Sequence, residues 1–296
     1  EALKLPSQTE VTIITVIPEH ALLGGINIDK LRGRDTSSSA KKKIQEEEAY
    51  KLLSSPSKLL SESGLKVESL VRRGNPAQAI LKVADECDAS LIVMGAKGLT
   101  GHPAFRLGSV SQTVLKHART SVLLARKKTI RANRSSPQGE TDATVDRVLF
   151  ATDGSKDANT ANQFLLDLPL PQQSQIIVVT ILQSYYESLR RVPTIEIAID
   201  EDLVTSIQAA EESAAQKIIE RSIQQFDAKG YKATSITLRG AAGESILEVA
   251  HKQDPDVIVL GCRGLTGIES FFLGSVSERV ARHAPCSVLI VRPPKA

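Results

Sequence analysis

The sequence predicts an α/β protein made of two tandem copies of one parallel-sheet domain, with helices on both faces of each sheet. Moving forward 166 positions aligns residues 91–126 with 257–292, and about 20 of the 36 positions are identical. In each copy, short β-branched apolar runs alternate with longer stretches of helical spacing, which is the order of right-handed βαβ units. A repeat of this length is a whole domain rather than a short solenoid unit.

The second half supplies the complete order of elements. Residues 147–152 form an apolar run that ends at Asp153-Gly154-Ser155, which predicts a buried strand followed by a polar turn. Further apolar, β-branched runs predict strands at 176–182, 233–238, 256–260 and 287–291. Helical spacing predicts helices at 156–167, 201–229, 244–252 and 275–283.

The first half follows the same order but begins late. Its strands are expected at 12–17, 67–71, 90–94 and 121–125, opposite the second to fifth strands of the other half. Glu1 falls opposite Leu166, so the sequence holds no counterpart of the first strand, of Asp153 or of most of the first helix. We expect an N-terminal stretch of at least about twenty residues to carry them, because a parallel sheet does not leave out its central strand.

Length and composition limit the class of protein. The 296 residues leave room for two domains, expected at 1–126 and 147–296, with a polar linker at 127–146. No apolar run approaches the roughly 18 residues of a membrane helix. The 3 scattered cysteines favour a reducing cytoplasm over a disulfide framework. A net charge of +3 and an aromatic content of 3% give no footprint for nucleic acid.

Each copy carries a glycine loop between a strand and a helix, with the pattern Gly-x-x-Gly, nine residues, Gly-Ser. The loops contain Gly95, Gly98, Gly108 and Ser109 in the first copy and Gly261, Gly264, Gly274 and Ser275 in the second. Glycine permits positive φ and lets a ligand approach the backbone closely. The helix N-terminus that follows offers unpaired N–H groups and a partial positive charge. The pattern predicts phosphate binding, with a purely structural turn as the alternative.

Several residues near the loops allow two interpretations. Ser275–Glu278 has the pattern of a capping box, and Ser109–Gln112 is its amide version, so one serine could serve as both cap and ligand. Arg263 and Lys97 could neutralise a phosphate or remain solvated. Asp153 could cap its own turn or contact a ligand at the end of its strand.

With these motifs the chain resembles the universal stress protein family, in a tandem form. The resemblance rests on the glycine signature, on the strand and Asp-Gly-Ser at 148–155, and on HAPCSVLIVRPP at 283–294. It implies a five-stranded parallel sheet of order 3-2-1-4-5 in each half that binds ATP, here with Mg²⁺, although some members bind no nucleotide. The first and fourth strands are neighbours in that order, so Asp153 and the loop at 261–275 would face one crevice.

The resemblance also implies individual roles. Asp153 would hold the adenine or ribose side, and the backbone of Ile181 would meet the base. The residues wrapped around the ribose and phosphates would be Gly261, Gly264, Gly274, Ser275 and Val276, together with Arg263. The matching residues of the first half are Val16, Gly95, Gly98, Gly108, Ser109 and Val110. The first half has no residue at the aspartate position, which puts a complete first site in question.

The leading hypothesis is therefore an ATP-binding regulatory protein of the stress response. Nucleotide occupancy would modulate its conformation or its binding to a protein partner that the sequence does not identify. Hydrolysis would be slow at most, because the sequence shows no general base paired with a metal cluster. The alternatives are a weak ATPase and a nucleotide-free interaction module. An adenylating enzyme is disfavoured, since residues 152–157 do not match a Ser-Gly-Gly-x-Asp-Ser loop.

The last strands suggest how the two copies assemble. Single-domain members of the resembled family commonly pair through their last strands. We therefore expect residues 121–125 to pair with 287–291 within the chain, which would hide two sheet edges. A homodimer of the whole chain is a further expectation.

Overall fold

The computed structural model describes the chain in separate segments. They are residues 8–18, 38–98, 107–126, 145–182, 201–265 and 273–294. Internal contacts divide them into two compact units, with the boundary between residues 89 and 90. That division falls inside the first copy, whereas the predicted domain boundary at residue 126 remains a prediction. Of the linker predicted at 127–146, residues 127–144 lie outside the described residues.

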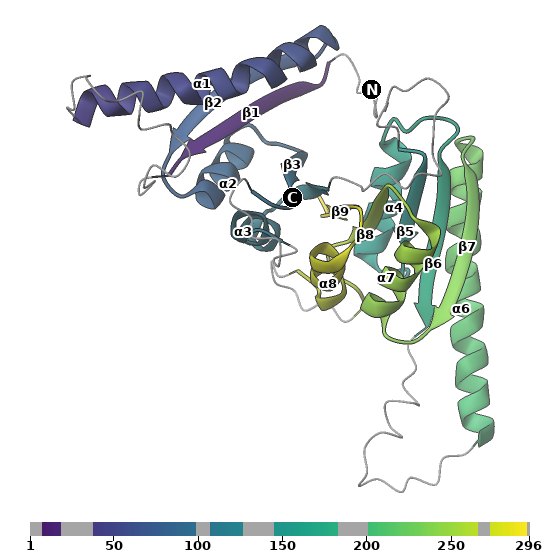
Figure 1. Cartoon of the computed structure of the whole chain (residues 1–296). Coiled ribbons are helices and arrows are strands. Elements are labelled where there is room, and N and C mark those ends of the chain that lie inside the picture. The colour runs from purple at the N-terminus through teal and green to yellow at the C-terminus, as the bar shows by residue number, and fades with distance from the viewer. Residues whose placement is uncertain are drawn as a thin grey trace, which may run out of the picture. The chain divides into compact units, whose positions relative to one another are not determined.

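Five neighbouring strands of the larger unit come from the second copy (Figure 1). They are β5 (Arg147–Ala151), β6 (Gln175–Leu182), β7 (Lys232–Arg239), β8 (Val257–Gly261) and β9 (Ser287–Val291). They lie in the order β7-β6-β5-β8-β9, and each neighbouring pair is parallel. In the numbering of a single domain this is the order 3-2-1-4-5. The predicted α/β fold class is confirmed.

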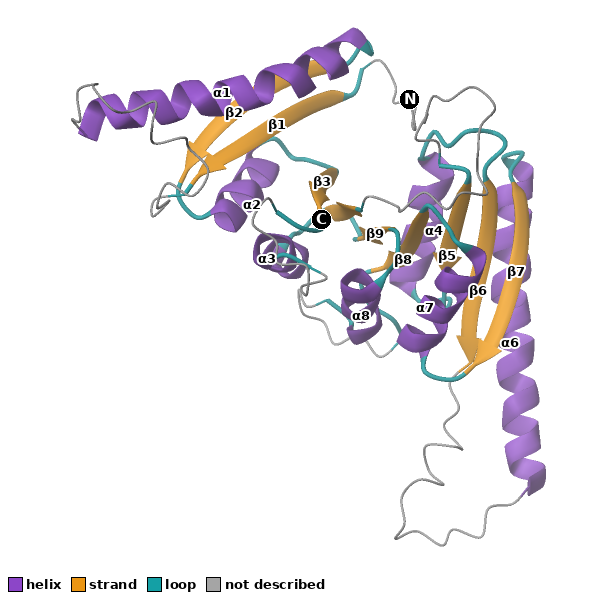
Figure 2. Ribbon diagram, in the orientation of Figure 1, coloured by secondary structure: helices purple, strands orange, loops and turns teal. Residues whose placement is uncertain are grey.

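Helices cover both faces of these strands (Figure 2). The described helices of the second copy are α4 (Lys156–Asp167), α6 (Glu201–Ala228), α7 (Ala242–Gln253) and α8 (Ser275–His283). The helix α4 packs beside α6 on one face, and α7 beside α8 on the other. Each helix begins and ends within two residues of its predicted bounds. Gly230, the predicted stop after α6, has a φ of +85°, a conformation that glycine adopts without steric cost.

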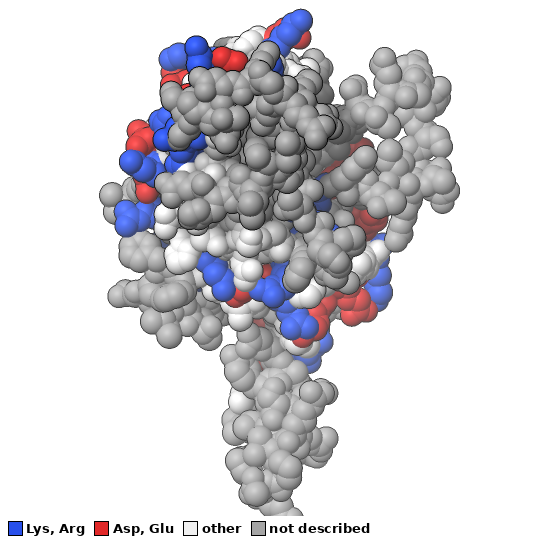
Figure 3. Space-filling model, turned by 60° about the vertical axis from the view of Figure 1, so that its left-hand side comes forward, with Lys and Arg blue, Asp and Glu red and all other residues white. Residues whose placement is uncertain are grey.

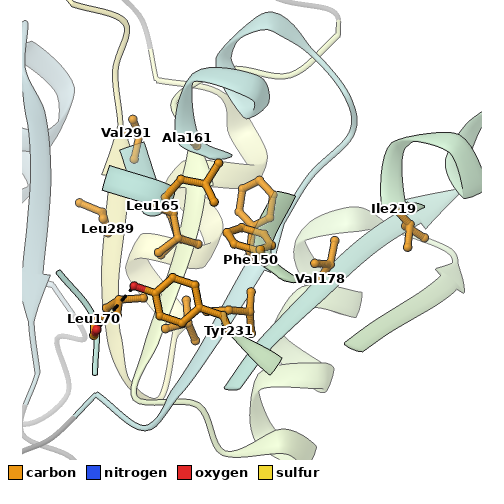
Figure 4. Close-up of a cluster of buried hydrophobic side chains, with 14 residues drawn as sticks. Phe150, Ala161, Leu165, Leu170, Val178, Ile219, Tyr231, Leu289 and Val291 are labelled. Atoms are coloured by element: carbon orange, nitrogen blue, oxygen red, sulfur yellow. Dashed lines mark hydrogen bonds between the residues drawn. The ribbon is translucent and has the colours of Figure 1, made fainter. Parts of the chain in front are cut away.

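The main hydrophobic core lies between the sheet and the helices α4 and α6 (Figure 4). Phe150 of β5 is fully buried and meets the ring of Phe226 of α6 edge to face, with 5.9 Å between the ring centroids. The Tyr231 hydroxyl donates a hydrogen bond to the carbonyl of Leu170, 3.5 Å away. These contacts fix β5 in the centre of the sheet, and its carboxyl end leads directly into the Asp153 turn.

The four strands of the first copy are divided between two sheets, and the five-stranded sheet expected for this copy stays a prediction. Its strands β1 (Glu10–Ile17) and β2 (Lys66–Arg73) form a separate two-stranded sheet in the smaller unit, with α1 (Ser38–Glu62) and α2 (Pro76–Glu86). The strands β3 (Leu91–Gly95) and β4 (Ser121–Ala125), with α3 (Ser109–His117), belong to the larger unit. They extend its sheet to seven strands.

The physical reason lies in the missing central strand. In the second copy, β6 and β8 pair with opposite edges of β5. Their equivalents β1 and β3 have no such strand to join them, because the sequence contains no counterpart of β5. Val93 of β3 is accordingly 62% exposed, whereas its equivalent Val259 of β8 is fully buried.

The two copies meet through their last strands. The strands β4 and β9 pair antiparallel, with Leu123 opposite Leu289, and the pairs on either side are Val122 with Ile290 and Leu124 with Val288. Leu123 and Leu289 are equivalent residues, so the pairing is self-complementary, as at a two-fold subunit interface. This is the strand pairing that the sequence analysis expects within the chain.

Helix hydropathy and the charges on one face bear on membrane and nucleic-acid binding. No described helix is both long and apolar enough to cross a bilayer. Figure 3 shows lysine and arginine interspersed with aspartate and glutamate over the described part of one face. Many of these charges form exposed pairs, such as Lys252 with Glu248 at 2.7 Å, and pairs of this kind contribute little to stability.

Candidate functional site

The Asp153 turn follows the central strand directly. Gly154 has a φ of +74°, which lets the chain reverse there. One carboxylate oxygen of Asp153, Oδ1, accepts a hydrogen bond from the Ser155 amide at 3.0 Å. Ser155 is in turn the N-cap of α4 and accepts from the Ala158 amide. The capping role foreseen for Asp153 therefore uses one of its two oxygens.

The second oxygen of Asp153 faces the glycine loop. Oδ2 accepts a hydrogen bond from the Leu265 amide at 3.1 Å. A Cβ atom at Gly264 would lie 2.7 Å from the same oxygen, so only glycine fits there without a shift. The strands β5 and β8 are neighbours, and both run into this edge of the sheet. The structure thus brings Asp153 and the second glycine loop together, at the edge where open α/β sheets bind ligands.

The other glycines of the second loop are needed for close packing. A Cβ at Gly261 would lie 2.7 Å from the backbone carbon of Asp157, in the first turn of α4. At Gly274 it would lie 3.1 Å from the carbonyl oxygen of Cys262, which accepts the Gly274 amide at 2.8 Å. None of the described loop glycines has a positive φ. Of the two properties that glycine offers, close approach rather than positive φ therefore explains these glycines.

Of the two interpretations of the loop serines, the capping box is wrong. The helix α8 begins at Ser275 itself, its N-cap is Gly274, and no side chain caps it. The same holds for α3, whose N-cap is Gly108 and whose first residue is Ser109. A capping box needs the serine one position earlier, outside the helix. Both serines are exposed, so their hydroxyls and the first-turn amides are available to an anion.

Sequence reasoning missed a second serine in each helix. The Ser277 hydroxyl donates to the Gly261 carbonyl at 2.8 Å, and the Ser111 hydroxyl donates to the Gly95 carbonyl at 2.9 Å. Each bond ties the first turn of a helix to the end of the strand before the loop. The signal was present in the repeated Gly-Ser-Val-Ser, whose second serine is shared by both copies.

The backbone of Ile181 extends past the last residue pair between β5 and β6. The last residue pair between β5 and β6 is Ala151 with Val179, followed by a hydrogen bond from the Thr152 amide to the Val179 carbonyl. The hydrogen bonds of a strand alternate between its two sides, so the Ile181 amide and carbonyl point to the same side as those of Val179. That side lies beyond the end of β5. Val276, the second residue of α8, is half-buried.

Arg263 is engaged with a residue that the sequence analysis did not single out. Its Nε donates to Asp157 Oδ2 at 2.8 Å, and the buried Cys262 thiol donates to the same oxygen at 2.9 Å. Burial alone raises the pKa of Asp157, but the hydrogen bonds from Arg263 and Cys262 outweigh it and lower the pKa overall. Burial is the main cause that raises the pKa of Cys262 to about 11. This cluster fastens the loop to α4, and phosphate contact by Arg263 stays a prediction.

The first copy lacks most of these contacts. A Cβ at Gly98 would meet nothing within 4 Å, and at Gly108 its nearest atoms would be 3.5 Å away. The Gly108 amide still donates to the Ala96 carbonyl at 2.8 Å, as Gly274 does to Cys262. Gly95, Gly108, Ser109 and Val110 lie in the larger unit, and among the described contacts of Gly98 and Gly108 there is no carboxylate. Val16 lies in the other compact unit.

Two further features bear on ligands. The middle parts of both loops, 99–106 and 266–272, lie outside the described residues, and so does His102. Among the described residues there is no group of three His, Cys, Asp or Glu side chains that could hold a metal ion.

Comparison with known proteins identifies relatives of both copies. The model of the universal stress protein family matches residues 1–126 and 144–292. A universal stress protein of Methanocaldococcus jannaschii is 36% identical over 94 residues, which are 32% of this chain and 54% of that protein. The chain thus spans about half the length of that relative. One from Synechocystis is 31% identical over 149 residues, which are 49% of this chain and 97% of that protein.

A solved structure covers both copies at once. The crystal structure of a universal stress protein from Archaeoglobus fulgidus aligns with 97% of this chain and 86% of its own, with 20% identity and a TM-score of 0.58. This likeness shows the fold.

Proposed function

Because the chain belongs to the universal stress protein family, we propose that it is an ATP-binding regulatory protein whose nucleotide site lies in the second copy. The observation that supports this most directly is the convergence of Asp153 with the second glycine loop. Their contact joins the ends of two neighbouring parallel strands to a helix that begins without a side-chain cap. An acidic group for a ribose and an open helix N-terminus for phosphates are then adjacent.

The roles follow from the positions. The amides and the hydroxyl at Ser275, with the Gly274 and Val276 backbone, would receive the phosphates. Asp153 Oδ2 would exchange the Leu265 amide for a ribose hydroxyl, and the Ile181 backbone would pair with the edge of the base. Gly261 and Gly264 would hold the loop close to α4 and Asp153. Mg²⁺ would accompany the phosphates. A phosphate would compete with Asp157 for Arg263.

The first copy is proposed as the weaker partner. Its loop residues Gly95, Gly98, Gly108, Ser109 and Val110 keep the phosphate-binding half of the pattern, and Val16 occupies the position of Ile181. Only the second loop is described with a carboxylate against it, that of Asp153. We therefore expect the second copy to hold the nucleotide, at about one ATP per chain.

Regulation fits the site better than fast catalysis. Phosphoryl transfer needs a positioned nucleophile and several charge clamps around the phosphates. Among the described residues at the site, both carboxylates are engaged in hydrogen bonds, Asp153 with Leu265 and Asp157 with Arg263. Hydrolysis would therefore be slow. Nucleotide occupancy would instead alter the pairing of the copies, a homodimer or a protein partner, in the cytoplasm.

The test is to identify nucleotide in the purified protein. The protein is denatured, the released nucleotide is identified by mass, and ATP binding with Mg²⁺ is then measured by calorimetry. We expect about one equivalent of ATP, and none in Asp153→Ala or Gly274→Val. Gly108→Val is the matched control in the first copy, and this variant should still release about one equivalent of ATP. If the purified protein releases no nucleotide and added ATP does not bind, the proposal is rejected and an interaction module is favoured. ADP with turnover of added ATP would favour the weak ATPase.

A further inference from the structure

Two equivalent arginines cross the junction between the copies in the same way. The Arg126 amide donates to the Ser287 hydroxyl at 3.2 Å, and the Arg292 amide donates to the Ser121 hydroxyl at 3.2 Å. The guanidinium of Arg126 donates to the Ala281 carbonyl, in the last turn of α8. The guanidinium of Arg292 donates at 2.8 Å to the equivalent carbonyl of α3, that of Leu115. Each copy thus clamps the helix of the other.

The two arginines differ in what lies beside them. The residue before Arg292, Val291, accepts the Cys262 amide through its carbonyl at 2.9 Å. Cys262 then holds two parts of the nucleotide loop: its thiol bonds Asp157, and its carbonyl accepts the Gly274 amide. Arg292 is therefore one peptide unit away from the residue that anchors both α4 and the start of α8. The equivalent residue beside Arg126 is Ala96, which has no thiol to offer.

The charges around Arg292 reinforce this link. Its side chain is buried, and within the described part of the chain its Nε has no hydrogen-bond acceptor. Burial lowers the pKa of the Arg292 guanidinium, and Asp157 and Arg263 lie near enough to shift it further in opposite directions. Arg263 and Cys262 are the groups that lower the pKa of Asp157 and hold it ionised. The link from Arg292 to the loop therefore runs through the backbone, from Val291 to Cys262.

We propose that Arg292 is a positioning residue that couples the pairing of β4 with β9 to the geometry of the nucleotide loop in the second copy. The first copy then does more than support the sheet. Through Leu115 and Ser121 it holds Arg292, and through Arg292 it sets how tightly the loop binds its ligand. The effect on affinity depends on the proposed ATP site, whereas the effect on the loop itself does not.

The matched variants Arg292→Gln and Arg126→Gln separate coupling from support. Both remove one guanidinium clamp, so both should lower the melting temperature. Amide hydrogen exchange of the ligand-free protein is then measured at Gly274 and Leu265. Exchange there should rise about tenfold in Arg292→Gln. It should rise less in Arg126→Gln, which releases only the last turn of α8, at the end away from the loop. The ATP dissociation constant should likewise rise about tenfold in Arg292→Gln and less in Arg126→Gln. Equal effects of both variants on the loop would overturn the proposal.

A double-mutant cycle provides the second test. Asp157→Asn combined with Arg292→Gln should be non-additive in loop exchange, and combined with Arg126→Gln it should be additive. Additivity in both combinations would contradict the coupling. If Arg292→Gln does not fold, Arg292→Lys takes its place, since it keeps the charge but loses the planar fork. Hydrogen exchange is measured without nucleotide, so it tests the role of Arg292 even if the wild-type protein binds no ATP. In that case the proposed function fails, but the proposed role of Arg292 is still decided by the exchange data.

Discussion

The sharpest prediction compares the same substitution in the two loops, Gly264→Ala and Gly98→Ala. Neither glycine has a positive φ, so alanine meets no backbone penalty at either position. The new methyl group at residue 264 would lie 2.7 Å from Asp153 Oδ2 and force the carboxylate away. At residue 98 it would enter open space. The pair therefore isolates the contact between Asp153 and the loop.

The expected size follows from the bond that is lost. Displacing Asp153 removes its hydrogen bond with the Leu265 amide, and a bond to a charged group contributes about 1.5–3 kcal/mol when it is well shielded. Leu265 is exposed, which reduces this to about 1 kcal/mol. Replacing glycine with alanine also restricts the unfolded chain and adds about 0.4–1 kcal/mol of stability to both variants. Gly98→Ala should thus be neutral or slightly stabilising, and Gly264→Ala about 1 kcal/mol less stable than it.

Ligand binding should separate the variants further. Asp153 is the proposed ribose contact, so we expect the ATP affinity of Gly264→Ala to fall at least about tenfold, which corresponds to about 1.4 kcal/mol. Chemical denaturation gives the stability difference, and calorimetry with Mg²⁺-ATP gives the affinity. Equal ATP affinities in the two variants would refute the assignment of the site to Asp153 and the second loop. A larger loss in Gly98→Ala would move the site to the first copy.

Three further predictions concern the junction, the buried carboxylate and the thiols. Leu289→Asp places an uncompensated charge at the centre of the β4–β9 pairing, where the side chain is 3% exposed, and should cost about 3–5 kcal/mol in denaturant unfolding. The pKa of Asp157 is lowered in the folded state, since its hydrogen bonds outweigh the rise from burial. The stabilisation from ionised Asp157 is therefore complete above its unfolded-state pKa of about 3.9 and is lost as the pH falls through its lower folded-state pKa. In Asp157→Asn the free energy of unfolding should therefore decrease less steeply at acid pH than in wild type. Cys87 is exposed, whereas Cys286 is buried and Cys262 is buried with a pKa of about 11, so a thiol reagent at pH 8 should modify one thiol in native protein and three after denaturation.

The local elements were predictable because each depends on a short stretch of sequence. The continuous β-branched run of β6 and the spacing of α4 place both elements within one residue of their observed bounds. The missing first strand was also evident from the repeat register. Its consequence was harder to foresee, because the division of the first copy between two sheets depends on what each strand edge can pair with. Periodicity along the chain does not report that pairing.

The site was predictable in its backbone and less so in its side chains. The glycine spacing and Asp153 were visible in the sequence because a loop that must approach another segment closely needs glycine at fixed positions. The engagement of Arg263 with Asp157 was not visible. The two residues are 106 positions apart, and nothing local distinguishes a paired arginine from a solvated one. The predicted start of the helix at Ser275 agrees with the structure, but the capping box would have needed that serine one position earlier, as the N-cap, which is Gly274.

The two copies show why a shared motif does not guarantee a shared environment. Gly264 and Gly98 occupy the same place in the same pattern, yet only Gly264 has a carboxylate against it. Cys262 and Ala96 likewise both accept the amide that begins the helix after the loop, but only Cys262 binds an acidic residue. In each case the acidic residue, Asp153 or Asp157, comes from the segment that follows β5. A motif that depends on a second segment should therefore be assigned a function where the contacts with that segment are seen, which here favours the second copy.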